Sequence, residues 1–126
     1  MITNNKSIIL IQFAQRCIDY FNNEFGRTPQ AFYKFFDCDE FPDACRGLGF
    51  EMDCGDSFVE AYGKEAWRSS VGLAAVIDTV DDVSLVGSGL FSKWRYFNHW
   101  ADSHGTDDDK EWFLLLLHRL KEIAER

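Results

Sequence analysis

Apolar residues recur at every third or fourth position over long segments of this sequence, and this periodicity constrains the fold more than any other feature. In residues 5–24, polar residues such as Gln12, Gln15 and Asp19 separate the apolar positions. This spacing places the apolar side chains on one face of an α-helix. The apolar positions are Leu10, Phe13, Ala14, Cys17, Ile18 and Phe21. The segment therefore predicts an amphipathic helix.

The same periodicity returns in three later segments, at residues 66–80, 84–101 and 106–125. Between the first and second of these four segments, Thr28 and Pro29 mark the start of a further helix, because threonine caps a helix and proline is tolerated at its first position. We therefore predict an all-α fold, a single compact bundle of five to seven helices. The last two segments are expected at its centre.

Two glycines near the start of the segment 84–101 indicate a close contact. Ser84 is the predicted N-cap of this helix. Gly87 and Gly89 follow it, although each glycine costs about 1 kcal/mol of helix stability relative to alanine. Because glycine has no Cβ, we expect another helix to cross closely at this point.

The chain has the length of one domain, and residues 1–126 are predicted to form a single helical domain. Hydrophobic residues make up 46% of the sequence and aromatic residues 16%, which predicts a core rich in rings and excludes the composition of a disordered chain. The longest apolar runs, residues 8–11 and 112–117, are far shorter than a membrane-spanning helix. No signal peptide is indicated, so we expect a cytoplasmic protein without a membrane partner.

Four cysteines, Cys17, Cys38, Cys45 and Cys54, are expected to be free thiols, because a helical core of this size does not need disulfides. Cys17 lies on the apolar face of the first helix, where cysteine acts as a small hydrophobic residue. The other three could converge on a metal, but they lack the short paired spacing of structural zinc sites. We therefore predict no metal and no cofactor.

Negative charge is concentrated where helical regularity is weakest. The net charge is −8, and residues 37–60 alone contain eight acidic residues and one basic residue. Pro42 and several glycines predict short helical turns and loop at 37–57. Such a field repels nucleic acid and favours a basic protein partner. The predicted partner-binding residues are Asp37, Asp39, Glu40, Phe41, Asp43, Glu51, Asp53, Asp56 and Glu60.

Other interpretations of this acidic segment are weighed beside the interface. Its carboxylates could be helix caps and solubilising charge, with the interleaved rings in the core. A calcium-binding EF-hand does not fit, because Pro42 stands where the loop from Asp37 requires glycine, and Leu48 stands where it requires glutamate. Phosphate-binding loops and dinucleotide-binding fingerprints do not occur either, which disfavours an NTPase or a dehydrogenase.

A second candidate site lies in the aromatic stretch at residues 94–104. Arg95, His99 and Asp102 would share one helix face, and His104 follows closely. A histidine beside a carboxylate can serve as a general base, and the two histidines with Asp102 could bind a metal. An ordinary surface face explains the same residues, and no partner nucleophile is evident, so no catalytic residue is assigned.

The leading hypothesis is a non-enzymatic acidic protein that binds a basic protein. Inhibitors, immunity proteins and antitoxins that neutralise nucleic-acid-acting proteins have this character, and the analogy is one of class only. The first alternative is a small enzyme or metal-binding protein that uses Arg95, His99, Asp102 and His104. The second is a structural subunit that self-associates through exposed rings.

Overall fold

The computed structural model describes residues 5–23, 40–100 and 107–126, with only the backbone at 97–100. Within these ranges the chain is helical and has no strand, which confirms the all-α prediction. The predicted helix start at Thr28 and Pro29 lies outside the described residues. The elements are α1 (Asn5–Asn23), α3 (Glu40–Gly47), α4 (Asp56–Tyr62), α5 (Lys64–Arg68), α6 (Ser70–Val76), the 3-10 turn η1 (Ile77–Thr79), α7 (Val83–Trp100) and α8 (Asp107–Glu125).

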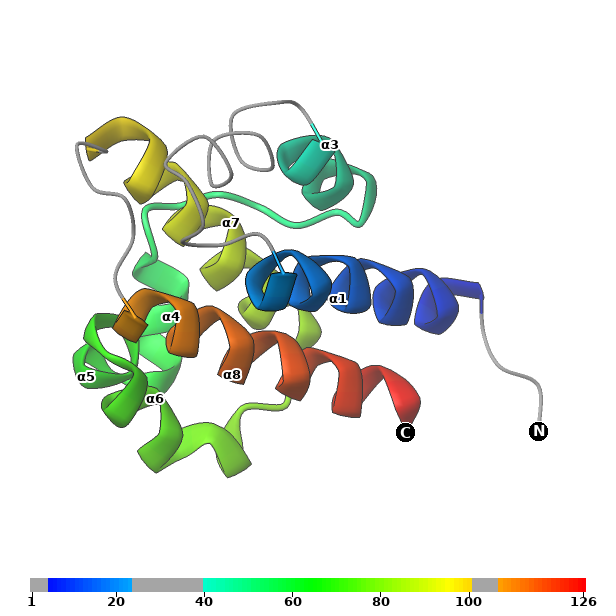
Figure 1. Cartoon of the computed structure of the whole chain (residues 1–126). Helices are drawn as coiled ribbons and strands as arrows, with labels where there is room; N and C mark the ends of the chain where they lie inside the picture. The colour runs from blue at the N-terminus through cyan, green and yellow to red at the C-terminus, as the bar shows by residue number, and fades with distance from the viewer. Residues whose placement is uncertain (1–4, 24–39, 101–106) are drawn as a thin grey trace.

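The first and last helices, α1 and α8, lie side by side in opposite directions (Figure 1). Their apolar faces meet, and the rings of Phe21 and Phe113 stack with centroids 4.9 Å apart. At the edge of the pair, the Lys121 ammonium donates a hydrogen bond of 2.8 Å to the side-chain oxygen of Gln15. The apolar faces that the periodicity predicts for the two helices therefore pack against each other.

Helix α8 is the central element of the described fold. It packs against α1, α6, η1 and α7, while α7 packs against α3, α4 and α8. The sequence placed α7 and α8 at the centre, and both do carry fully buried residues. The most extensive contact of α8, however, is with α1 and not with α7. The reason is that both helices carry a long row of buried residues, from Leu10 to Phe21 in α1 and from Trp112 to Ala124 in α8.

Trp112, in the first turns of α8, joins three other helices. Its ring centroid lies 5.9 Å from that of Phe58 of α4 and 5.8 Å from that of Trp67 of α5. Its indole Nε1 donates a 2.7 Å hydrogen bond to the Ala66 carbonyl. The Lys93 ammonium of α7 lies 4.7 Å from the same ring. With 1% of its surface exposed, Trp112 is buried with its polar atom satisfied.

The single helix predicted over 66–80 is wrong, since this segment is divided among α5, α6 and η1. The break is at Ser69, whose backbone is extended and whose hydroxyl accepts the Gly72 N–H at 3.0 Å. The helix restarts there because Ser69 serves as an N-cap. Gly72 then packs so closely against α5 that a Cβ would lie 2.0 Å from the Glu65 carbonyl oxygen. Apolar periodicity continues across the break and does not reveal it.

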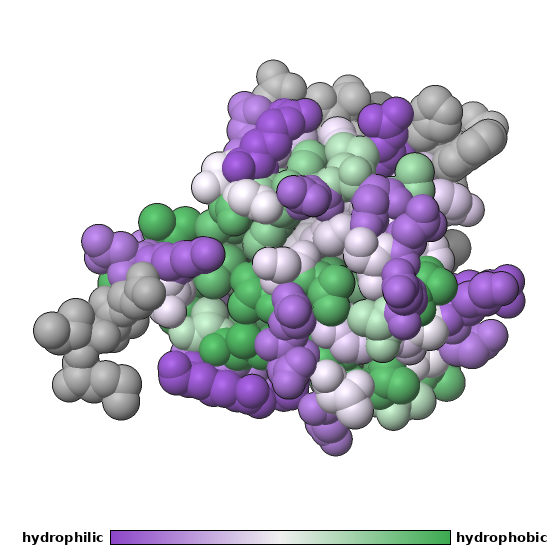
Figure 2. All heavy atoms as spheres, turned by 180° about the vertical axis from the view of Figure 1, so that it is seen from behind, coloured by the Kyte–Doolittle hydropathy of each residue, from purple (hydrophilic) through white to green (hydrophobic). Residues whose placement is uncertain are grey.

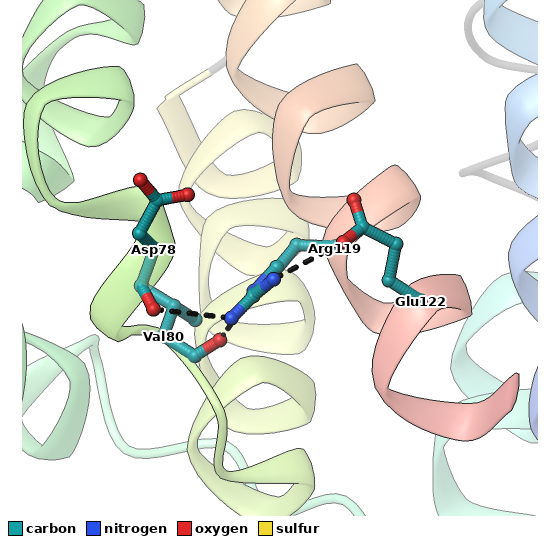
Figure 3. A network of polar contacts seen from close by, with 4 residues as sticks. All are labelled: Asp78, Val80, Arg119 and Glu122. Carbon is teal, nitrogen blue, oxygen red and sulfur yellow. Dashed lines mark hydrogen bonds and ion pairs between the residues drawn. The ribbon is translucent and has the colours of Figure 1, made fainter. Parts of the chain in front are cut away.

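Arg119 of α8 holds the end of this divided segment (Figure 3). Its guanidinium donates to the carbonyl oxygens of Val80 and Asp78 at 2.7 and 3.1 Å, and to the Glu122 carboxylate at 3.1 Å. Arg119 is only 9% exposed. Its donors therefore satisfy carbonyl groups at the end of η1 that have no helical partner.

In the described part of the irregular segment predicted at 37–57, residues from Glu40 to Gly47 form helix α3, which contains Pro42 in its first turn. Proline is tolerated there because the first N–H groups of a helix have no helical partner. Residues 48–55 form turns and loop, as predicted. At the start of α7 the predicted cap is wrong, because the Asp82 carboxylate accepts the Leu85 N–H at 3.1 Å and Ser84 lies inside the helix.

The close helix crossing predicted at Gly87 and Gly89 is present at Gly89, whereas Gly87 faces a ring from the loop between α3 and α4. A Cβ on Gly87 would lie 2.1 Å from the ring of Phe50, and one on Gly89 would lie 2.7 Å from the ring of Phe58. Phe58 belongs to α4, which crosses α7 here. The glycines of α7 thus admit two rings into the core at the expense of helix propensity.

We expect Gly87→Ala to destabilise the protein by about 1 to 3 kcal/mol, because the added methyl would displace the Phe50 ring. Gly47→Ala in α3 is the control, since a Cβ at Gly47 meets nothing within 4 Å. It should leave stability unchanged or raise it by up to about 1 kcal/mol. Urea unfolding of both variants measures the difference, and equal stabilities would contradict the close contact.

Candidate functional site

The predicted partner-binding residues separate into several structural groups. Asp37 and Asp39 lie outside the described residues. Phe41 does not belong to the surface, because its side chain is 1% exposed. Its ring packs against Phe13 of α1 at 5.8 Å and Trp94 of α7 at 6.3 Å. This prediction is corrected: α3 turns Phe41 into the core, where burial of a ring contributes more stability than a polar contact at the rim.

The other two interleaved rings, Phe50 and Phe58, are also buried, at 6% and 0% exposed. They occupy the space above Gly87 and Gly89. Rings that alternate with carboxylates in this part of the sequence therefore point inward while the carboxylates stay at the surface. The alternative that assigned these rings to the core describes them correctly.

Glu40 and Asp43, both on α3, are exposed and take part in ion pairs. Arg16 of α1 lies 2.9 Å from the Glu40 carboxylate, and Arg46 lies 3.1 Å from that of Asp43. Exposed pairs of this kind contribute little stability, but they reduce the local negative potential. The charge of α3 is thus partly compensated within the protein.

Glu51, Asp56 and Glu60 are exposed, and within the described ranges none of them forms an ion pair with a lysine or arginine. Asp56 and Glu60 lie one turn apart on α4 and therefore share a face. We call these three residues the open acidic surface. Among the described residues of the predicted interface, these are the exposed carboxylates without a cationic partner.

Asp53 has a different role, since it organises the loop before α4. Its carboxylate accepts the backbone N–H groups of Gly55 and Ser57, each at 3.1 Å, and the hydroxyl of Ser57. Cys54 and Gly55 adopt positive φ angles of 64° and 87°, which bend the chain back over the carboxylate. Asp53 thereby caps the start of α4 from outside the helix.

Two serines of α7 complete the contacts of Asp53. The hydroxyl of Ser88 donates to Oδ1 at 3.1 Å. The hydroxyl of Ser92 donates to the same oxygen at 3.3 Å and accepts the Asp53 backbone N–H at 3.1 Å. Partial burial acts to raise the pKa of Asp53, but the hydrogen bonds from Ser57, Ser88 and Gly55 outweigh it and hold the pKa below its usual value. A fixed, ionised carboxylate results.

We expect Asp53→Asn to lower the free energy of unfolding by about 1 to 2 kcal/mol near neutral pH, because the charged acceptor of these bonds is lost. A pKa that is lower in the folded state stabilises above about pH 4 and ceases to do so as the carboxylate is protonated. The difference between the two proteins should therefore shrink as pH falls below about 4. Asp56→Asn is the control, and chemical unfolding at several pH values measures both. A pH-independent difference would contradict this role.

A polar hollow with a volume of about 260 Å³ opens beside Asp53. It is lined by Gly49, Glu51, Asp53, Ser57, Ser84, Leu85 and Ser88. Three hydroxyl groups and two carboxylates therefore face one concave space between α4, α7 and the preceding loop. The Glu51 carboxylate and the three hydroxyl groups can accept a hydrogen bond from a ligand, and Asp53 adds negative charge. The lining therefore suits a hydrogen-bond donor with positive charge.

Most of the second candidate site lies outside the residues that the structure describes. Asp102 and His104 lie outside the described residues, and only the backbone is described at His99. Arg95 is exposed on α7, with its Nη1 atom 3.8 Å from the sulfur of Met52. The structure thus shows one member of this set and leaves the predicted constellation untested.

The cysteines that the structure describes are free thiols. Cys17 and Cys45 are buried, and burial raises the pKa of both thiols, whereas Cys54 is exposed. Cys38 lies outside the described residues. Over the described ranges no group of three or more metal-binding side chains occurs.

Lys93 is an ionisable residue that the sequence does not single out. Its side chain is 7% exposed, and its ammonium lies 4.2 Å from the ring of Trp67 and 4.7 Å from that of Trp112. It donates a hydrogen bond to the Trp67 carbonyl. Burial lowers its pKa to about 8, although the charges of Asp109 and Asp108 act in the opposite direction. Lys93, on α7, therefore links this helix to the end of α5 through Trp67 and to α8 through the ring of Trp112.

A lysine whose pKa is lower in the folded than in the unfolded state makes stability rise with pH between the two pKa values. From about pH 8 to about pH 10.5, the stability of the native protein relative to Lys93→Met should therefore increase by up to about 3 kcal/mol, at about 1.36 kcal/mol per pH unit. Equilibrium unfolding across this range measures the difference. The buried Cys17 and Cys45 thiols make stability fall as pH rises, but they do so equally in both proteins, so the difference between the proteins cancels their effect. A difference in stability that does not change with pH would contradict a lowered pKa of Lys93.

Sequence reasoning missed the serines that line the hollow and hold Asp53. Ser84, Ser88 and Ser92 follow one another at intervals of four on α7, so they form a polar stripe along the mainly apolar first part of this helix. This spacing is the feature of the sequence that could have identified the serines. The partner of the stripe, Asp53, lies 35 residues before Ser88, and periodicity carries no information about that pairing.

Comparison with protein-family models, with curated proteins and with solved structures finds no match for this chain. Its function must therefore be inferred from the arrangement of its own residues.

Proposed function

We propose that this protein binds a basic protein through the open acidic surface of Glu51, Asp56 and Glu60 and is not an enzyme. The supporting observation is that these three carboxylates are exposed without a cationic partner in the described part of the chain, whereas Glu40 and Asp43 on α3 are paired. Uncompensated like charges repel one another, and a basic partner would remove that repulsion.

The kind of partner follows from the sign of the charge. The full chain has a net charge of −8, which steers it toward cationic surfaces and away from phosphate backbones. We infer a cytoplasmic inhibitor of a nucleic-acid-acting protein, comparable in class to immunity proteins and antitoxins. Such a protein covers a basic groove and needs no catalytic group of its own.

No described helix is long and apolar enough to cross a membrane. On the rear face, hydrophilic side chains are spread among hydrophobic ones over the residues shown in colour, without one dominant hydrophobic area (Figure 2).

The test is capture of partners from the native host over a series of salt concentrations, followed by mass spectrometry. We expect a basic protein whose capture weakens as salt rises, because screening acts beyond about 8 Å at physiological ionic strength. The triple variant Glu51→Gln, Asp56→Asn, Glu60→Gln should reduce its association rate at low salt about tenfold or more.

The matched control is the triple variant Glu65→Gln, Glu111→Gln, Glu125→Gln, which removes three exposed charges elsewhere and changes net charge equally. It should bind nearly as well as the native protein. Equal losses in both variants would show that only net charge matters, and capture that is independent of salt would reject the acidic surface. A sedimentation mass above that of one chain, with no partner captured, would favour self-association.

A further inference from the structure

The polar hollow beside Asp53 has the chemistry of a binding site for one basic side chain. Its two carboxylates, Glu51 and Asp53, differ in mobility, since Glu51 is exposed while Asp53 is held by hydrogen bonds from α4 and α7. Among the residues that line it, none is cationic. The hollow therefore presents negative charge in a concave space without an internal counter-charge.

The rigidity of Asp53 matters because a fixed charge does not have to be ordered when a ligand binds. Its two oxygens accept hydrogen bonds from Gly55, Ser57, Ser88 and Ser92, so they are largely occupied. Asp53 thus supplies charge at the wall of the hollow. The acceptors left for a ligand are the Glu51 carboxylate and the hydroxyl lone pairs of Ser57, Ser84 and Ser88.

The size and the lining select the kind of ligand. At about 260 Å³, the hollow is smaller than the roughly 300–1,000 Å³ of pockets that enclose drug-sized ligands, so a single side chain fits better than a cofactor. A guanidinium presents five donors in one plane and can therefore use more of these four separate acceptor groups at once than a compact ammonium can.

The position of the hollow connects it to the open acidic surface. Glu51 belongs to both, and Asp56 directly precedes Ser57, which lines the hollow. A basic partner drawn to Asp56 and Glu60 would therefore arrive beside the opening. We propose that the hollow receives one arginine side chain of the partner and so anchors the complex; this inference rests on the proposed function.

The probe is N-acetyl-arginine-N′-methylamide, and the matched control is the citrulline compound, which is nearly the same shape but uncharged. Titration into the ¹⁵N-labelled full chain should give saturable shifts of the backbone amides of Gly49, Glu51, Ser57, Ser84 and Ser88. The citrulline compound should give none. Shifts of equal size with both compounds, or shifts spread evenly over all exposed carboxylates, would reject the site.

Two variants of an exposed residue keep the test independent of folding. Glu51→Gln should weaken binding of the arginine probe about threefold, as expected for a partly exposed charged contact, and Glu51→Lys should abolish the shifts because it places a cation in the hollow. Glu65→Gln, on α5 outside the hollow, should bind as the native protein does. Unchanged binding by the Glu51 variants would overturn the assignment.

Failure of this inference differs from failure of the proposed function. If the acidic triple variant loses the partner while the arginine probe never shifts the hollow, the surface binds a basic protein without an arginine anchor. If the probe binds the hollow and the triple variant still captures the same partner equally well, the hollow is a site but the acidic surface is not the interface.

Discussion

The packing of Trp112 is the contact on which the rest of the described structure depends. One indole meets rings from α4 and α5, accepts the Lys93 ammonium of α7 on its face and donates to the Ala66 carbonyl. Helices α4 and α5 are only seven and five residues long, too short to be stable alone. They hold their shape because they are packed against a large ring on a long helix.

The same arrangement positions the candidate site. Phe58, which packs on Trp112, also covers Gly89, and this contact sets α4 against α7. On the neighbouring side of α7, Ser88 and Ser92 then reach Asp53 in the loop before α4. The polar hollow therefore exists because the core beneath α4 and the loop before it holds them in place against α7. Its shape should respond to changes in that core.

The distribution of charge is the feature of the structure from which a binding function is proposed. Part of the acidic segment is neutralised by Arg16 and Arg46, and one carboxylate, Asp53, is used internally. Among the described residues of this segment, the carboxylates that stay exposed and unpaired are Glu51, Asp56 and Glu60, with Glu51 at the edge of a concave, acceptor-lined space. A surface of this kind suits recognition of a basic protein, where steering and one anchored side chain act together.

The sequence by itself determined the all-α fold, the start of α7 and the end of α8 to within about a residue, and the close contact at Gly87 and Gly89, because apolar spacing and glycine placement are local properties. Only the tertiary structure decided that Ser69 divides the helix at 66–80, that Phe41 points into the core, and that Asp53 meets the serines of α7. The last two depend on which distant residues come into contact, whereas the first depends on a local cap that apolar periodicity does not reveal. Periodicity describes one face of a helix and does not say which face of another helix will cover it.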